Sequence, residues 1–400
     1  MFVGWKGDVV IEDTTCVQTD VLHSSLQELR DILSRANLTN RSESTFAGTF
    51  RAALDIPRVR TLIEWEVPKV TDLSQVLDLR HEGEVSAIRL DLLAGVGNLK
   101  KLVVAGLMLR GVIKERIPLA GVNTLTDAGN MNTGFALKYY CAKYGFRGHY
   151  IMSRLFPRDM VAMLQDAIFH VEQAPANDNL GVEEEFYRYL HKRVRDVEFR
   201  RNKHCLWHAK YGGDVLYPLG REVAQTLDTV PDYLVVSVGA GSTLTCLTAI
   251  KAHFEENLGI SPKIVVVEHN QSPIFAKFLP TSSPTPLPAQ IRENKCMSSF
   301  SPVAFRKPPT KRTPHFVIGP HYEKPNPLLS DRVIGQVDHV QQYTDREWMM
   351  MSHYLECQGT GIGNSSAAHV AVSAYLASKG YKVLTVIMEP MRSYYTSRCC

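Results

Sequence analysis

The sequence predicts an α/β fold in which mostly parallel sheets are flanked by helices. From Val85 onward, β-rich apolar runs alternate with longer helical patterns, which is typical of β-α-β units. Several of these strands are followed by short glycine-containing or polar turns that lead into the next helix. The chain has 400 residues, of which 44% are hydrophobic and 22% charged, a balance typical of globular proteins. This length is ample for a large core and for an enzyme body in two parts.

The elements are expected in the following order. A helical pattern near residues 20–36 comes first, within a polar segment. Strands are expected at 85–93, 120–126, 148–152, 233–238, 263–268 and 382–388. Helices are expected at 99–113, 133–145, 158–170, 183–199, 243–257, 345–358 and 365–379. No internal repeat is visible.

One segment, residues 276–314, departs from this alternation because it is rich in Pro, Ser and Thr. Proline removes backbone donors, so a regular element is not expected there, and we interpret the segment as an inserted loop. The predicted organisation is an N-terminal extension over 1–50, an N-terminal subdomain over 51–205, and a C-terminal subdomain over 206–400 that contains the insertion.

Charge and cysteine content exclude several classes of protein. Lys plus Arg (45) against Asp plus Glu (41) leave a net charge of +4, too small for a nucleic-acid footprint. The eight cysteines form no C-x-x-C pair and are interpreted as reduced thiols, with no metal site. No apolar run approaches the roughly 18 residues of a membrane span, and no signal peptide is evident. We therefore expect a cytoplasmic protein without membrane or nucleic-acid partners.

The strongest single motif follows the strand that begins at Tyr233. The loop Gly239-Ala240-Gly241-Ser242-Thr243 leads from this strand into a helix. Small residues leave backbone N–H groups free at the helix N-terminus, beside two hydroxyls, which suits a phosphate group. The loop is neither a P-loop nor a full dinucleotide fingerprint. Taken alone, it could also be a tight turn without a ligand.

A second motif places a lysine at a helix start. The run Gly95-Val-Gly97-Asn98-Leu-Lys100 joins a strand to a helix. The positive end of a helix disfavours a cation, as a lysine that forms a Schiff base requires. In isolation a surface lysine would be the more common interpretation. Two further polar turns, 126–134 and 361–368, also lead into helices and could simply cap them.

Taken together and in this order, from about residue 60 to the C-terminus, these segments resemble the fold-type II pyridoxal-phosphate enzymes, which are tryptophan synthase β-like. The nearest resemblance is to the O-acetylserine sulfhydrylase (cysteine synthase) and cystathionine β-synthase family. It implies two open, twisted, mostly parallel sheets and pyridoxal 5′-phosphate as cofactor. The family segment G-S-V-K-D-R is similar to Gly97–Leu102, which makes Lys100 the Schiff-base and catalytic residue. The family phosphate loop G-T-G-G-T is similar to Gly239–Thr243, so all five of these residues are expected to bind the cofactor.

The asparagine segment of the family, S-G-N-T-G-x-A-L, is similar to Asn130–Leu137. In this register Asn132 contacts the 3′-oxygen of the cofactor, while Asn130 and Thr133 bind the substrate carboxylate. A second register stays open, because Ala128-Gly129-Asn130 resembles the S-A-G-N of threonine and serine dehydratases. We favour Asn132, since Thr133–Phe146 then follows the family helix without a gap.

Two later landmarks complete the resemblance. The family segment G-I-S-S-G-A is similar to Gly363–Ala368, which implies that Ser366 contacts the pyridine nitrogen, with Ser365 as the alternative. Val317-Ile318-Gly319 looks like a family landmark near the substrate, so Gly319 is expected to bind substrate. Lys101 and Met131 stand where the family has aspartate and glycine.

The resemblance implies a cysteine synthase-like transferase of amino-acid biosynthesis. It would replace the leaving group of an activated serine, of the O-acetylserine or O-phosphoserine type, by a thiol, sulfide or amine through an aminoacrylate. One alternative is β-elimination of the serine/threonine dehydratase or ammonia-lyase type, which the Asn130 register favours. A second is a cofactor-free homologue that serves as a partner-binding subunit, suggested by the altered Lys101 and Met131 positions. The family is usually homodimeric, and a homodimer is expected by analogy.

Overall fold

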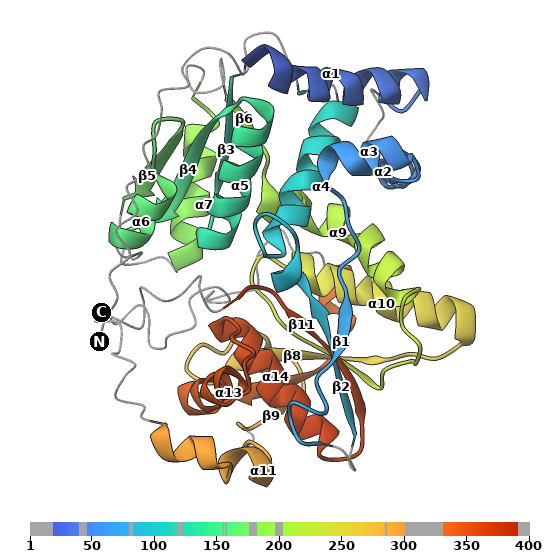
Figure 1. Cartoon of the computed structure of the whole chain (residues 1–400), viewed down its shortest axis with the longest axis vertical. Coiled ribbons are helices and arrows are strands. Elements are labelled where there is room, and N and C mark those ends of the chain that lie inside the picture. Colours follow the sequence, from blue (N-terminus) through green and yellow to red (C-terminus); the bar gives the residue numbers. More distant parts are fainter. Residues whose placement is uncertain are drawn as a thin grey trace.

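The computed structural model gives the chain an α/β body built around two open sheets (Figure 1). It describes residues 19–39, 46–79, 83–114, 116–117, 123–154, 156, 158–175, 182–196, 203–284, 286–300 and 331–390. The α/β fold with parallel-rich sheets flanked by helices, predicted from the alternation of patterns, is confirmed.

The larger sheet has the strand order β1-β2-β11-β7-β8-β10-β9. Its strands are β1 (Val70–Asp72), β2 (Glu84–Arg89), β7 (Tyr233–Ser237), β8 (Lys263–His269), β9 (Thr281–Ser282), β10 (Val337–Tyr343) and β11 (Lys382–Ile387). Only the edge pair β1 and β2 is antiparallel, and every other pair is parallel. β8 reads Lys-Ile-Val-Val-Val-Glu-His and is buried from its second residue on, as expected for a central strand covered on both faces.

The smaller sheet is fully parallel, in the order β5-β4-β3-β6. It contains β3 (Thr124–Ala128), β4 (Arg147–Ser153), β5 (Phe169–Ala174) and β6 (Lys203–Cys205). Figure 1 shows this sheet with α5 (Met131–Tyr144), α6 (Arg158–Leu164) and α7 (Val182–Arg193) in one part of the molecule. The larger sheet, with α13 (Asp345–Cys357) and α14 (Asn364–Ala377), forms the other part.

Four further long helices pack beside the two sheets (Figure 1). They are α1 (Thr19–Arg35), α4 (Lys100–Ile113), α9 (His208–Ala224) and α10 (Ser242–Leu258). Shorter helices are α2 (Phe46–Leu54), α3 (Pro57–Ile63), α11 (Ala289–Arg292) and α12 (Asp331–Ile334). One continuous apolar core joins residues of α1, α4, α5, α9, α10 and both sheets. A second core lies between the larger sheet, α13 and α14.

The predicted strands and helices mostly fall on observed elements, with one clear error. The helix expected at 158–170 ends at Leu164, and the chain then enters β5 at Phe169. Asp166 accepts hydrogen bonds from the N–H groups of Ile168 and Phe169, which turns the chain between the two elements. Phe169 and Val171 are buried and His170 is exposed, so burial alternates from residue to residue, as it does in a strand.

The described part of residues 1–50 is not a detached extension. Leu26, Leu29 and Leu33 of α1 are completely buried, and α1 packs on α3, α4 and α5. Strands β1 and β2 lie in the same sheet as the C-terminal strands, so the polypeptide crosses between the two parts. The subdomain boundary expected near residue 205 stays a prediction.

The described part of the proline-rich segment carries short elements only, as its composition predicts. β9 pairs with β10 at the edge of the larger sheet, and α11 begins after Pro288. Leu287 and Ile291 are buried in the second core. The described part of the segment is therefore packed against the body. Residues 301–330, including Gly319, lie outside the described residues.

Candidate active site

The two sheets each have a point at which the strand order reverses. In the larger sheet, β8, β10 and β9 lie on one side of β7, whereas β11, β2 and β1 lie on the other. In the smaller sheet, β4 and β5 lie on one side of β3, and β6 lies on the other. Open parallel sheets bind ligands beyond the carboxyl ends of their strands at such points. The loop at 238–241 follows β7 and the asparagine turn follows β3, so both predicted binding loops occupy these positions.

The residues after β11 connect these loops. The N–H of Leu99, next to Lys100, donates to the carbonyl of Met388 at 3.2 Å. The hydroxyl of Thr243 lies 3.8 Å from Met388 Sδ. The N–H of Met388 donates to the hydroxyl oxygen of Ser366 at 3.0 Å. Three segments that lie far apart in the sequence therefore meet at one residue.

The next residue, Glu389, contacts the asparagine segment. Its side chain is 1% exposed. Asn132 Nδ2 lies 3.5 Å from Glu389 Oε2, and the hydroxyl of Ser365 donates to Glu389 Oε1 at 2.8 Å. All four sequence motifs thus converge at Met388 and Glu389. Neither Met388 nor Glu389 was expected in the site from the sequence. Their position directly after a buried strand is the sequence feature that could have indicated them.

Lys100 is the first residue of α4, and its position is set by the residue two before it. The backbone N–H of Lys100 donates to Asn98 Oδ1 at 2.8 Å, and Asn98 is buried. This bond satisfies one of the N–H groups that a helix start leaves without an intrahelical partner. The glycine turn before it contains Gly95 and Gly97, both with positive φ, at 79° and 65°. The predicted attachment lysine therefore lies at a defined helix N-terminus.

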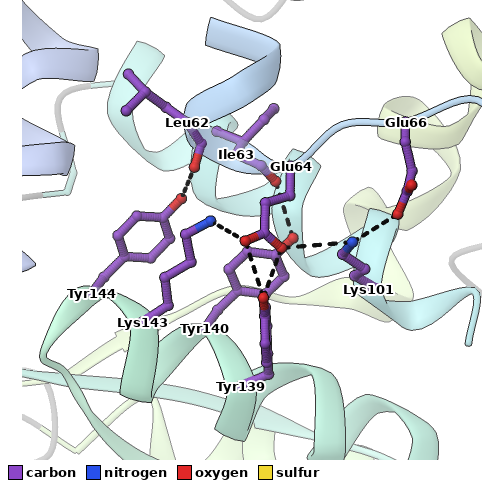
Figure 2. A network of polar contacts seen from close by, with 9 residues as sticks. All are labelled: Leu62, Ile63, Glu64, Glu66, Lys101, Tyr139, Tyr140, Lys143 and Tyr144. Atoms are coloured by element: carbon purple, nitrogen blue, oxygen red, sulfur yellow. Dashed lines mark hydrogen bonds and ion pairs between the residues drawn. The ribbon is translucent and has the colours of Figure 1, made fainter. Parts of the chain in front are cut away.

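Lys101 has a separate, structural role. Its side chain is 2% exposed, and Nζ lies 2.7 Å from Glu66 Oε1 and 3.6 Å from Glu64 Oε2. Figure 2 shows these contacts as part of a network that ties α4 and α5 to the end of α3. Lys143 and Tyr139, both on α5, also contact the Glu64 carboxylate. The altered residue after Lys100 therefore builds a buried ion-pair cluster.

The same network perturbs two pKa values. Burial alone would raise the pKa of Glu64, but hydrogen bonds from Lys143 and Tyr139 and the charges of Lys143 and Lys101 outweigh it, so the pKa is lowered. Burial and the hydrogen bond to Glu64 raise the pKa of Tyr139 to about 12. Glu64 is thus held as a carboxylate. Tyr140 and Tyr144 complete the cluster by donating to the carbonyls of Ile63 and Leu62 (Figure 2).

The phosphate loop has the features of an anion site. Gly241 is the N-cap of α10, with φ of 91°, and no side chain caps this helix start. Ser242 is buried at 3% exposure. A helix start without a side-chain cap leaves its first N–H groups available to an anion, and the helix dipole favours a negative charge there.

Replacing Gly241 with valine is expected to weaken cofactor binding. A β-branched residue at this φ costs on the order of 1–2 kcal/mol, and its side chain would occupy the approach of the phosphate. Because 1.4 kcal/mol is tenfold in affinity, we expect the dissociation constant for pyridoxal 5′-phosphate to rise by about tenfold or more. The measurement is fluorescence titration of the apoprotein.

Gly259→Val is the matched control for this variant. Gly259 caps the other end of α10, has a φ of 66°, and has no atom within 4 Å of an added Cβ. It therefore carries the same kind of backbone strain far from the loop. Equal losses of affinity in both variants would show that strain in α10, rather than the phosphate contact, is responsible.

The asparagine turn is built around the start of α5. Asn130 is the N-cap residue of this helix, and its carbonyl accepts a hydrogen bond from the Tyr150 hydroxyl at 2.7 Å. Thr133 is 1% exposed. Asn132 Oδ1 is buried and has no hydrogen-bond partner among the residues described. A buried amide oxygen without a partner is costly, which is consistent with a ligand at this turn.

A second cluster at the same end of the smaller sheet was missed by sequence reasoning. Asp127, at the end of β3, accepts the N–H of His208 at 3.0 Å and so caps the start of α9. His208 Nδ1 lies 3.2 Å from Asp127 Oδ1, and His208 Nε2 lies 3.1 Å from the Tyr187 hydroxyl. Asp127 is 1% exposed, so its carboxylate is buried within this cluster.

Burial is the main influence on the pKa of His208, and the charges of Asp127 and Lys100 act on it as well. Burial lowers the pKa of His208, the charge of Asp127 opposes this shift, and the charge of Lys100 adds to it. The net direction is downward, so the imidazole is neutral near neutral pH. His208 is therefore close enough to Lys100 to be influenced by its charge. The only sequence signal was a histidine shortly after a short strand, which is too common to interpret.

No group of three or more His, Cys, Asp or Glu residues within the described ranges could hold a metal ion. No helix in the same ranges is long and apolar enough to cross a membrane.

The chain belongs to the family of pyridoxal-phosphate dependent enzymes, whose model matches residues 70–388. The family resemblance read from the motifs, and pyridoxal 5′-phosphate as the cofactor, are thereby confirmed. The match covers all four converging motifs. The glycine at the N-terminus of α10 and the buried Asn132 amide fit this cofactor, since they offer an anion site and an unsatisfied polar group.

Two solved structures are similar in fold. O-acetylserine sulfhydrylase isoform 3 from Entamoeba histolytica aligns with a TM-score of 0.60 and 13% identity, covering 83% of this chain and 88% of that one. The O-acetylserine dependent cystathionine beta-synthase from Helicobacter pylori aligns with a TM-score of 0.61 and 15% identity, covering 83% and 95%. No curated protein sequence matches significantly. The neighbours confirm the fold-type II architecture.

Proposed function

We propose that this chain catalyses β-replacement on an activated serine, of the O-acetylserine or O-phosphoserine type, with a thiol, sulfide or amine as nucleophile. The observation that carries the proposal is the convergence of the lysine, asparagine, phosphate and serine motifs at Met388 and Glu389. The cysteine synthase-type fold of the two structural neighbours supports it. We further propose, by family analogy, a cytoplasmic homodimer.

The roles of individual residues follow from their positions. When bound, the cofactor supplies an electron sink for bonds broken at the α-carbon of an amino acid. The loop from Gly239 to Thr243, which leads into α10, would hold its phosphate. Lys100 would attach it covalently and, once released as an amine, accept the substrate α-proton at Nζ. One of the two serines at the start of α14, Ser365 or Ser366, would face the pyridine nitrogen, and Asn132 the 3′-oxygen.

The substrate carboxylate would lie at the start of α5. Asn130 and Thr133 are at the N-cap and third residue of this helix, where N–H groups and the helix dipole favour an anion. Gly319 stays a proposed substrate contact outside the described residues. The neutral His208 lies beneath this turn, since a Cβ on Gly129 would come 2.9 Å from its Cε1.

The proposal is tested with the holoprotein and a panel of O-acetylserine, O-phosphoserine, serine and cysteine, each with and without sulfide. The expected result is a sulfur-containing amino acid, identified by mass spectrometry, that forms only from an activated serine and only with sulfide. Release of pyruvate without a nucleophile would instead establish β-elimination. A protein that retains no cofactor would support the partner-binding alternative.

Substitutions in the asparagine turn distinguish its two registers. If Asn132 faces the cofactor, Asn132→Ala should shift the absorbance of the bound cofactor and lower its affinity. Thr133→Ala should raise the substrate KM by about 10–100-fold with little change in the spectrum, because a hydrogen bond to a charged carboxylate is worth about 1.5–3 kcal/mol. A silent Asn132→Ala together with a perturbed Asn130→Ala would favour the dehydratase-like register.

A further inference from the structure

The carboxylate of Glu389 lies among residues proposed to face the cofactor. It contacts the Ser365 hydroxyl and the Asn132 amide through different oxygens, at 2.8 and 3.5 Å. The main chain of Glu389 is also held, because its carbonyl accepts the N–H of Gly363 at 3.0 Å. A Cβ added to Gly363 would lie 2.3 Å from Glu389 Oε1. The carboxylate is therefore pressed against the start of α14, and only glycine leaves room for it.

The two serines at this helix start offer different hydrogen bonds. The Ser365 hydroxyl donates its hydrogen bond to Glu389, so only its oxygen lone pairs remain for another partner. The Ser366 oxygen already accepts the N–H of Met388. Ser366 is completely buried, whereas Ser365 keeps 7% exposure. Ser365 is thus the serine with surface left for a ligand, and towards that ligand it acts as an acceptor.

We propose that Ser365 and Glu389 act as a coupled pair that accepts a hydrogen bond from the ring nitrogen of bound pyridoxal 5′-phosphate and holds that nitrogen protonated. A lone serine could equally donate to an unprotonated nitrogen, because a hydroxyl can donate or accept. The carboxylate removes this choice because it accepts the hydrogen bond that the hydroxyl donates. Its negative charge also favours the protonated form of a nearby base. Glu389 acts through Ser365 and is a positioning residue.

This pair changes the chemistry expected of the site. A protonated ring nitrogen withdraws electrons from the substrate α-carbon more strongly than a neutral one, so negative charge that develops at this carbon is stabilised further. A serine without a carboxylate behind it would not by itself hold the nitrogen protonated. The inference requires only that the cofactor binds at this site, and it does not depend on whether β-replacement is the reaction.

The test uses pyridoxal 5′-phosphate labelled with ¹⁵N at the ring nitrogen and bound to the full chain. The ¹⁵N chemical shift separates a protonated from an unprotonated ring nitrogen without any turnover. In mildly alkaline buffer we expect the protonated shift for the wild type. Glu389→Gln keeps the size of the side chain and removes its charge, so the signal should move to the unprotonated position. Ser365→Ala should do the same, and Ser366→Ala, the matched control, should leave the signal unchanged.

An unprotonated ring nitrogen in the wild type, or a chain that binds no cofactor, would overturn the proposal without any variant. It would also be overturned if the nitrogen stayed protonated in Glu389→Gln, or if Ser366→Ala moved the signal and Ser365→Ala did not. If Glu389→Gln does not fold, the ¹⁵N signal of Ser365→Ala serves as the test of the proposal, because this variant keeps the Glu389 carboxylate in place. A protonated ring nitrogen in a protein that catalyses no β-replacement would contradict the proposed function and still support this inference.

Discussion

Replacing Lys100 with alanine should abolish covalent cofactor attachment and lower turnover by about 10³-fold or more. One residue is assigned both attachment and proton transfer, and a positioned acid-base group alone contributes about 10² to 10⁴-fold. Borohydride reduction of the wild type followed by peptide mapping should place the pyridoxyl label on Lys100. The variant should bind the cofactor without a covalent bond, because the N-terminus of α10 is unchanged.

Lys114→Ala provides the control. Lys114 is the C-cap residue of α4, so it lies at the opposite end of the same helix. Its replacement should leave both label and turnover as in the wild type. A label found on Lys101 or Lys114 would show that the assignment is wrong.

Removing both acids around Lys101 should destabilise the protein strongly. In Glu64→Gln with Glu66→Gln, the lysine ammonium stays buried without its two partners. Stranding a buried charge in this way costs about 3–5 kcal/mol. The free energy of unfolding, measured by urea denaturation, should fall by that amount. Adding Lys101→Met to the double variant should recover most of the loss, since no buried charge is then left.

Lys101→Met alone should cost less than the double acid variant. Glu64 and Glu66 keep 30% and 41% of their side-chain surface exposed, and Glu64 retains Lys143 and Tyr139 as partners. A loss equal to that of the double variant would show that packing around the lysine stem, rather than its charge, is decisive.

The network also has a defined pH dependence. Because the pKa of Glu64 is lower in the folded chain than its ordinary value of 4.5, its contribution to stability is present above that value. The contribution is lost as the pH falls through the folded-state pKa. Glu64→Gln should therefore reduce the difference in stability between neutral and acidic solution.

The sequence predicted the parts of the site that depend on local backbone chemistry. Lys100 and the loop from Gly239 to Thr243 are recognisable because their glycine turns and small residues at helix starts occur together and in the order that the family has, although each alone has other uses. α9 was missed because Gly212, Gly213 and Pro218 are poor helix formers. A glycine is needed in this helix because α10 packs very closely: a Cβ on Gly220 would lie 2.1 Å from the Cys246 carbonyl oxygen.

The parts that could not be predicted depend on tertiary contacts. Nothing local distinguishes Glu389 from any glutamate that follows a strand, and its role appears only when Asn132 and Ser365 are brought to it. Lys101 was expected to be notable only as a departure from the family aspartate. Its partners Glu64 and Glu66 lie more than thirty residues earlier, so no local pattern links them.

The position of β11 in the larger sheet sets the order in which the protein can be completed during synthesis. β11 pairs with β2 on one side and β7 on the other. β2, which begins at Glu84, therefore gains this neighbour only after the strand that begins at Lys382 has been synthesised. Until then the nascent chain exposes two apolar strand edges, which readily pair with other chains. β11 is the last strand of the larger sheet in chain order, so Met388 and Glu389 can join the four motifs only after all the other strands of that sheet have been synthesised.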